Sequence, residues 1–335
     1  MHISFVDVCP TPVEGTARDA FANAVALALQ AEALGCRRYW VAEHHGSNAI
    51  ASQAPEILIG HIAAKTSHIR VGSGAVLLNH YSPLKVAEQF RMLHALHPGR
   101  IDLGVGRAFA GRVADPALQR HRDSRRVDDY GDQVLELLFW MKNAMPADHP
   151  FATMDLGYDV ADAPEMLLLG SSQQSPFLAA QLGLPYTFAG FISPQGAESA
   201  IRNYRENFRP SAVTGLDRPY VILAMHVVCA DDMAEAERQA MTVRHMYDQI
   251  GTGKMSSRLA SPDQAVAHFG GVIEAEDELW PRFVIGDPPR VAAIIGRMIE
   301  RVQPDELMVQ DLIVDHPARI RSQALLAGLF APGRN

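Results

Sequence analysis

The sequence predicts a single (β/α)8 barrel, and two observations support this fold class. Short apolar runs alternate with longer amphipathic segments along all 335 residues. Nearly every short run is apolar on both faces, as strands are when helices cover both sides of a parallel sheet. Eight strand–helix units fit a closed barrel, which commonly fills one domain of this length. A doubly wound sheet is the second candidate, although no GxGxxG sequence opens the first unit.

Strands are predicted where short apolar runs are bounded by turn residues. "ISFVDV", "RYWVAEH" and "IRVGSGAVLL" are the first three, and each is followed by a loop rich in glycine, proline or serine. The eight predicted strands occupy residues 3–8, 38–44, 69–78, 101–106, 165–170, 186–190, 220–230 and 306–313.

Helices are predicted where apolar residues recur at helical spacing between start and stop residues. Pro55 and Pro83 each open a helix, and Gly35 and Gly99 each follow the end of one. The predicted helices occupy residues 17–35, 55–67, 83–99, 124–142, 176–183, 196–208, 233–250, 288–302 and 316–330.

Three segments, 107–123, 143–164 and 251–287, are longer than simple connections and are interpreted as insertions at the C-terminal face of the barrel. The last is irregular in pattern and contains glycine and serine, so it is a candidate mobile lid. Because no linker composition divides the chain, residues 1–335 are expected to form one domain.

The composition excludes several classes of function. The net charge of −8, from 30 Lys and Arg against 38 Asp and Glu, argues against a protein that binds duplex nucleic acid. The three cysteines, Cys9, Cys36 and Cys229, match no zinc or disulfide pattern. No signal peptide and no apolar stretch approaching the ~20 residues of a membrane span is found. We therefore expect a cytoplasmic protein whose partners are small molecules.

The stretch "YWVAEHHGSN" places Glu43, His44 and His45 at the C-terminal end of the second predicted strand, the catalytic face of such barrels. Adjacent strand residues point to opposite faces, so one histidine should face the barrel mouth and the other the helix layer or a subunit interface. A metal site is not indicated, because adjacent histidines do not converge on one ion and no HxH or HExxH motif is present.

Other polar residues also follow predicted strands. Asn79 and His80 follow the third strand and Arg107 the fourth, whereas His226 lies within the seventh and is interpreted as a satisfied core residue. "GSSQQSP" after the fifth strand offers Ser171, Ser172 and Ser175 with backbone N–H groups before a helix, which suits an anion but also suits plain N-capping. Glycines within "GSGAV" indicate a bulge or the close approach of a flat ligand. Glu88, in the helix 83–99, could pair with His45, join a subunit contact or remain solvated.

Several stretches together resemble the bacterial luciferase-like flavin monooxygenases, and most closely their stand-alone, single-chain branch. They are "RYWVAEHHG", "IRVGSGAVLLNHYSPLKVAEQFRMLHALHPGRIDLGVGRA" and "MLLLGSSQQSPFLAAQLGLPYTFAG", and the resemblance extends from residue 3 to about residue 328. It implies a (β/α)8 barrel that binds reduced FMN at its C-terminal mouth. The flavin would come from a separate reductase and react with O2 to a C4a-hydroperoxide that oxygenates an organic substrate. The resemblance also implies a homodimer.

The resemblance assigns roles to individual residues. His44 matches the catalytic acid/base, whereas His45 and Glu88 match residues near the subunit interface. A non-prolyl cis peptide is expected at Gly74–Ala75, against the flavin ring, with Arg107 beside the flavin. Arg125, with Arg126 as its alternative, and the serines Ser171, Ser172 and Ser175 match positions at the FMN phosphate.

One departure concerns Gly106, which stands where light-emitting luciferase has a reactive cysteine. Light emission and a long-chain aldehyde substrate are therefore not expected. Three other functions remain open. They are F420-dependent hydride transfer on the same fold, flavin binding with little turnover, and metal-dependent hydrolysis, for which the ligand set is missing.

Overall fold

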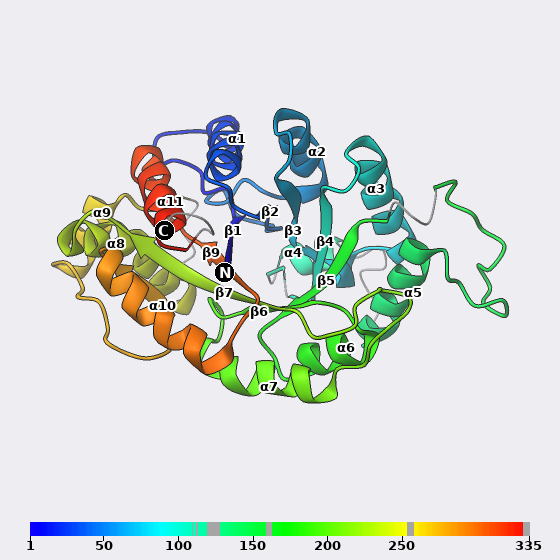
Figure 1. Cartoon of the computed structure of the whole chain (residues 1–335). Helices are drawn as coiled ribbons and strands as arrows, with labels where there is room; N and C mark the ends of the chain where they lie inside the picture. Colours follow the sequence, from blue (N-terminus) through cyan, green and yellow to red (C-terminus); the bar gives the residue numbers. More distant parts are fainter. Residues whose placement is uncertain (109, 112, 119–127, 159–162, 253–257, 331–335) are drawn as a thin grey trace.

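The computed structural model describes residues 1–330 apart from 109, 112, 119–127, 159–162 and 253–257. It contains a closed barrel of eight parallel strands surrounded by helices, which confirms the predicted fold class (Figure 1). The barrel strands follow in spatial order as β1 (His2–Asp7), β2 (Arg38–Val41), β3 (Arg70–Leu77), β4 (Ile101–Gly106), β5 (Glu165–Gly170), β6 (Tyr186–Ala189), β7 (Val221–Cys229) and β9 (Glu306–Gln310).

A ninth strand, β8 (Phe283–Gly286), lies inside the segment that was expected to be irregular. β7 pairs with β9 from Ile222 to His226, and with β8 from His226 to Cys229. The same segment also contains the helix α9 (Pro262–Phe269). The expectation of an irregular 251–287 was therefore wrong at both places. β8 forms because β7 is long enough to pair with an extra strand, and α9 forms behind a capping box of Ser261 and Gln264. Whether the remainder moves as a lid stays a prediction.

The helices lie close to the predicted ranges. They are α1 (Ala17–Ala33), α2 (Pro55–Lys65), α3 (Pro83–Leu96), α4 (Ala114–Leu118), α5 (Tyr130–Lys142), α6 (Gln174–Leu182), α7 (Ala197–Asn207), α8 (Met233–Gly251), α10 (Pro288–Val302) and α11 (His316–Phe330), with short 3-10 turns η1 (Leu78–His80) and η3 (Pro194–Gly196). None of the helices in the described ranges is long and apolar enough to cross a membrane.

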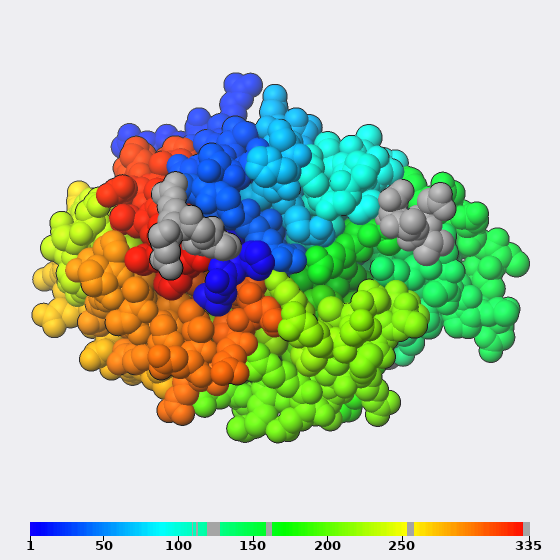
Figure 2. All heavy atoms as spheres, viewed as in Figure 1, coloured from blue at the N-terminus to red at the C-terminus, as the bar shows by residue number. Residues whose placement is uncertain are grey.

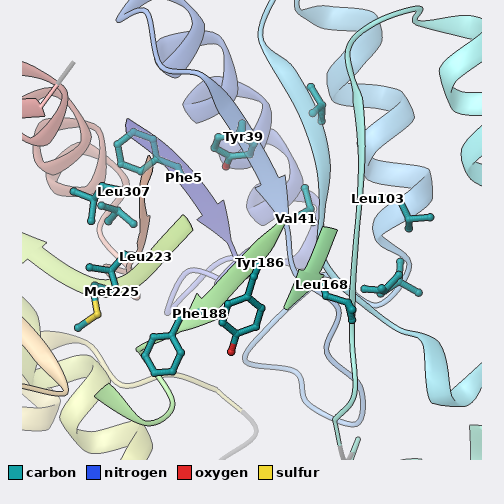
Figure 3. Packing of buried hydrophobic residues seen from close by; sticks show 14 of the residues in the cluster. Phe5, Tyr39, Val41, Leu103, Leu168, Tyr186, Phe188, Leu223, Met225 and Leu307 are labelled. Atoms are coloured by element: carbon teal, nitrogen blue, oxygen red, sulfur yellow. The ribbon is translucent and has the colours of Figure 1, made fainter. Parts of the chain in front are cut away.

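The outward faces of the strands and the inner faces of the helices form one large apolar layer. Figure 3 shows part of it, with Tyr39, Tyr186 and Leu307 among the buried side chains. Burial of this layer supplies the main driving force that holds the helices on the barrel, at about 25 cal/mol for each Å² of apolar surface.

The inward faces near the N-terminal ends of the strands are ionic instead. Arg38 is fully buried, and its guanidinium donates to Asp102 Oδ2 at 2.8 Å and to Glu306 Oε1 at 2.9 Å. Trp40 Nε1 donates to the same Asp102 oxygen at 2.8 Å. The chain's first residues, dark blue in the space-filling view of Figure 2, lead into β1 at this same end of the barrel.

The inward faces near the C-terminal ends of the strands carry small side chains. Ala42, Gly74, Gly106 and Ala189 all occupy such positions and leave space above the packed interior. The distribution of side-chain size along the barrel therefore decides which end can receive a ligand.

We predict that Arg38→Met destabilises the protein by about 3–5 kcal/mol, because it removes the fully buried cation that Asp102 and Glu306 share. The partly exposed Arg70 and Arg37 would remain as their only charged partners within the described residues. Urea unfolding measures this change. The control is Arg321→Met, which removes an exposed pair with Asp231 and should cost at most about 1 kcal/mol. Equal losses for the two variants would contradict the structural importance of the ionic layer.

Candidate functional site

A cavity of about 470 Å³ opens at the C-terminal ends of the strands. Its floor is made by the small strand-end residues, and its wall includes His44, Arg107 and Ser171 from the loops that follow β2, β4 and β5. The structure therefore brings together residues that lie up to 127 positions apart, from His44 to Ser171. This is the face of the barrel that the sequence predicted to be functional.

His44 faces the cavity, while its backbone N–H is anchored to the carbonyl of Ser52 at 2.8 Å. Its ring nitrogen Nδ1 is buried and has no hydrogen-bond partner within the described ranges. Burial, aided by the neighbouring His45, lowers the pKa of His44 from 6.5 to about 4. The imidazole is therefore neutral near pH 7, with free hydrogen-bonding capacity.

Glu43 holds the histidine loop in place. Its carboxylate is 4% exposed, accepts from His45 Nε2 and Tyr81 Oη at 2.6 Å each, and accepts from the backbone N–H of Leu77 at 2.9 Å. These bonds join the loop after β2 to the end of β3 and to the turn beyond η1. The sequence placed Glu43 correctly but gave no sign that its partners would come from residues 77 and 81.

The two histidines have different surroundings, as the alternation of strand residues predicted. His45 pairs with Glu43 rather than with Glu88, whose exposed carboxylate accepts from Lys85 Nζ at 2.9 Å. Within the described chain, the suggested pairing of His45 with Glu88 is therefore not formed. The position of Glu88 at a subunit interface stays a prediction.

The peptide bond between Gly74 and Ala75 is cis, as the resemblance implied. Both residues line the cavity, and the pairing of β3 with β4 shifts register between Ser73 and Val76. A Cβ atom added to Gly74 would lie 2.9 Å from Trp40 Cε3, so the packed interior directly below excludes a larger residue. The backbone and the small side chain of Ala75 here form part of the cavity wall.

Arg107 lies at the cavity edge, where it forms an ion pair of 3.0 Å between Nη1 and Oδ1 of Asp128. Its side chain is half exposed, so the pair is well solvated and can exchange for another anion at small cost. Arg125 and its alternative Arg126 lie outside the described residues.

The serines after β5 divide into two groups. Ser171 lines the cavity. Ser172 instead accepts weakly from the backbone N–H groups of Gln174 and Ser175, at 3.3 and 3.4 Å, and Ser175 Oγ lies 3.3 Å from Tyr186 Oη. Ser172 thus accepts from the first backbone N–H groups of α6, although the N-cap position itself is Gln173 and has no side-chain cap bond.

The upper wall of the cavity comes largely from residues to which no role was assigned from the sequence; one, Leu259, lies in the candidate lid 251–287. They include the apolar residues Phe191, Met246, Tyr247 and Leu259 and the polar residues His245 and Gln249. Most come from the C-terminal part of α8, which the helical pattern predicted without indicating which face would cover the barrel. In the part of the chain that the structure describes, no cluster of three or more His, Cys, Asp or Glu residues could hold a metal ion.

We predict that Glu43→Gln lowers the free energy of unfolding by about 1–3 kcal/mol, because an amide nitrogen cannot accept and one buried donor loses its partner. The matched control is Glu88→Gln, which changes an exposed carboxylate and should stay within about 0.5 kcal/mol. Denaturant unfolding compares the two variants. A loss no larger for Glu43→Gln than for the control would remove Glu43 from its structural role.

We also predict the pH dependence that follows from His44. The unfolded chain takes up a proton near pH 6.5, and the folded chain does so only near pH 4, so stability should fall as the pH drops from 6.5 to 4. The imidazole resonances of His44 in NMR titration should show a midpoint near 4, and His44→Gln should flatten the fall in stability. A midpoint near 6.5 would contradict the burial of the ring.

The sequence matches the family model described as luciferase-like monooxygenase over residues 1–296. A luciferase-like monooxygenase of Escherichia coli strain K12 is 37% identical over 322 residues, covering 95% of this chain and 94% of that protein. N-acetyl-S-alkylcysteine monooxygenase of Bacillus subtilis is 38% identical, covering 84% of each chain. The oxygenase component of a flavin-dependent trigonelline monooxygenase from Acinetobacter baylyi is 30% identical, covering 70% of this chain and 67% of that one.

Among solved structures, apo-MsnO8 superimposes with a TM-score of 0.87 at 39% identity, covering 100% of this chain and 99% of that one. The family match, the identities and the coverage agree with the barrel fold. This chain belongs to the luciferase-like monooxygenase family.

Proposed function

We propose that this monooxygenase uses reduced FMN and O2 to oxygenate a small organic substrate. The observation that carries the proposal is the cavity itself, which combines the cis peptide Gly74–Ala75 in its wall with a half-buried His44 whose buried Nδ1 has no partner among the described residues. The flavin-dependent relative from Acinetobacter baylyi supports a flavin as the cofactor.

The residues present fit a flavin. The small floor residues leave room for a flat ring, and the orphaned nitrogen of His44 is a hydrogen-bonding group that awaits a ligand. Gly74, Ala75 and Arg107 would contact the ring system. Ser171, with Ser172 and Ser175 at the start of α6, would bind the phosphate together with Arg125.

Reduced flavin would supply the oxygen chemistry, and the protein would supply position, a dry surrounding and proton transfer. Phe191, Met246 and Tyr247 would exclude water from above the ring. Because Nδ1 of His44 is buried, protons would pass between His44 and the bound molecules at Nε2. The part of 251–287 that carries Arg258 and Leu259 already lines the cavity and would act as the closing lid.

The partners are proposed on separate grounds. The trigonelline relative is named as an oxygenase component, which supports a separate reductase that delivers reduced flavin to this chain as well. A homodimer through α2 and α3 is supported by Ile57, Met92 and Leu96, which are 73%, 56% and 66% exposed on these neighbouring helices. The mass found by sedimentation equilibrium tests the dimer.

The decisive experiment measures oxygen uptake by the protein with reduced FMN and a candidate substrate. N-acetyl-S-methylcysteine is the first candidate because one relative is named for this class of thioether. We expect uptake that depends on substrate and a product that contains one atom of ¹⁸O from labelled O2. His44→Gln should lower product formation by roughly 10²–10⁴-fold with little change in FMN affinity.

The control is His61→Gln, which changes an exposed histidine of α2 and should leave product formation intact. If reduced FMN binds no more tightly than to an unrelated protein and is oxidised as it is free in solution, the proposal fails. Hydride exchange with F420 under the same conditions would then favour the F420-dependent alternative.

A further inference from the structure

We propose that Gln310 is a ligand-binding residue that recognises the neutral amide or imide edge of a molecule in the cavity. This inference deepens the proposed function. It rests on that function in one respect, which is that the flavin is one of the two molecules considered as the source of the edge. No role was assigned to Gln310 from the sequence.

Gln310 is the last residue of β9 and points into the barrel. Its partners in register are Val6 of β1 and His226 of β7, and Val6 belongs to the apolar cluster inside the barrel. The side chain is only 7% exposed, yet it lines the cavity. Within the described ranges, its amide makes no hydrogen bond to the protein, so its donor and its acceptor both remain available.

His226 lies beside Gln310 on the same inward face. It is fully buried, and neither ring nitrogen has a hydrogen-bond partner in the described part of the chain. Its ring and that of Phe283 form a T-shaped pair, with centroids 5.2 Å apart. The prediction that His226 is a satisfied core histidine was therefore half right, since it is in the core but unsatisfied.

Two adjacent polar side chains without partners are unusual in a folded interior, where most buried polar atoms are hydrogen-bonded. Both ring nitrogens of His226 are buried, whereas Gln310 lines the cavity, where a bound molecule can pair with the donor and the acceptor of its amide. Gln310 is accessible from the cavity and His226 is behind it, so a ligand would bond to Gln310 directly and His226 would support the amide.

The surroundings indicate that the recognised group is neutral. Burial, together with the nearby charge of Arg319, lowers the pKa of His226 to about 3, so the ring carries no charge near pH 7. Arg319 itself is bonded to Asp7 at 2.7 Å and to Asp311 at 2.5 Å on the outer side of the barrel. The nearby cation Arg319 is already paired with two carboxylates, so it offers little to a carboxylate beside Gln310, whereas an amide would form two hydrogen bonds with the side-chain amide.

Two sources could supply such an edge. The pyrimidine ring of a flavin presents C=O, N–H and C=O in a row, and an amide-bearing substrate presents the same pair of groups. Both molecules would offer the same C=O acceptor and N–H donor to Gln310. Comparing the affinities of a flavin probe and an amide probe identifies which of them is the source.

The test compares Gln310→Met with the control Gln249→Met, which removes a second amide that lines the same cavity from α8. Fluorescence quenching gives the Kd of FMN and of N3-methyl-FMN, whose imide donor is blocked. Saturation-transfer NMR gives the Kd of hexanamide and of hexanoate. All measurements use the full-length protein, and Gln310→Asn replaces the Met variant if that variant does not fold.

If the flavin is the source, Gln310→Met should raise the Kd of FMN by about 5–30-fold and the Kd of N3-methyl-FMN much less. If the substrate is the source, the Kd of hexanamide should rise by a similar factor, while the Kd values of FMN and hexanoate stay unchanged. The inference is overturned if Gln310→Met affects no probe more than the control does. Failure of FMN to bind the wild-type protein would contradict the proposed function alone, since the hexanamide comparison still decides the role of Gln310.

Discussion

The size of the side chains that point into the barrel is the constraint on which the rest of the structure depends. In a closed eight-stranded barrel the interior must be filled by side chains, because a void forfeits packing energy. Arg38, Trp40 and their partners fill the N-terminal half, and alanines and glycines leave the C-terminal end open. The cavity is thus a consequence of which residues occupy alternate strand positions, with no separate domain needed to form it.

A second requirement is that the loops around the opening keep a fixed geometry. Glu43 ties the histidine loop to the end of β3, and Asn79 ties the next turn to the loop after β4 through bonds with the backbone of Ala108 at 3.2 and 3.4 Å. The turn at residues 78–81 therefore links His44 on one side to Arg107 on the other. Such support keeps a reactive side chain within the narrow range of positions that catalysis requires.

The sequence predicted the barrel because strand–helix alternation is a local pattern repeated eight times. It also placed His44, Arg107 and Ser171 at one face, since all strand ends of a parallel barrel converge there. It missed β8, a four-residue strand that exists only because β7 extends beyond β9. It could not identify the partners of Glu43, or show that the amide of Gln310 lacks a hydrogen-bond partner among the described residues, because both depend on contacts between residues far apart in the chain.

A crystal structure of the protein with bound FMN tests the central claim most directly. The flavin ring should lie against the wall formed by Gly74 and Ala75, within contact distance of His44. Its phosphate should lie near Ser171, just before α6. A flavin bound outside the barrel mouth, or a ring separated from His44 by protein, would contradict this claim.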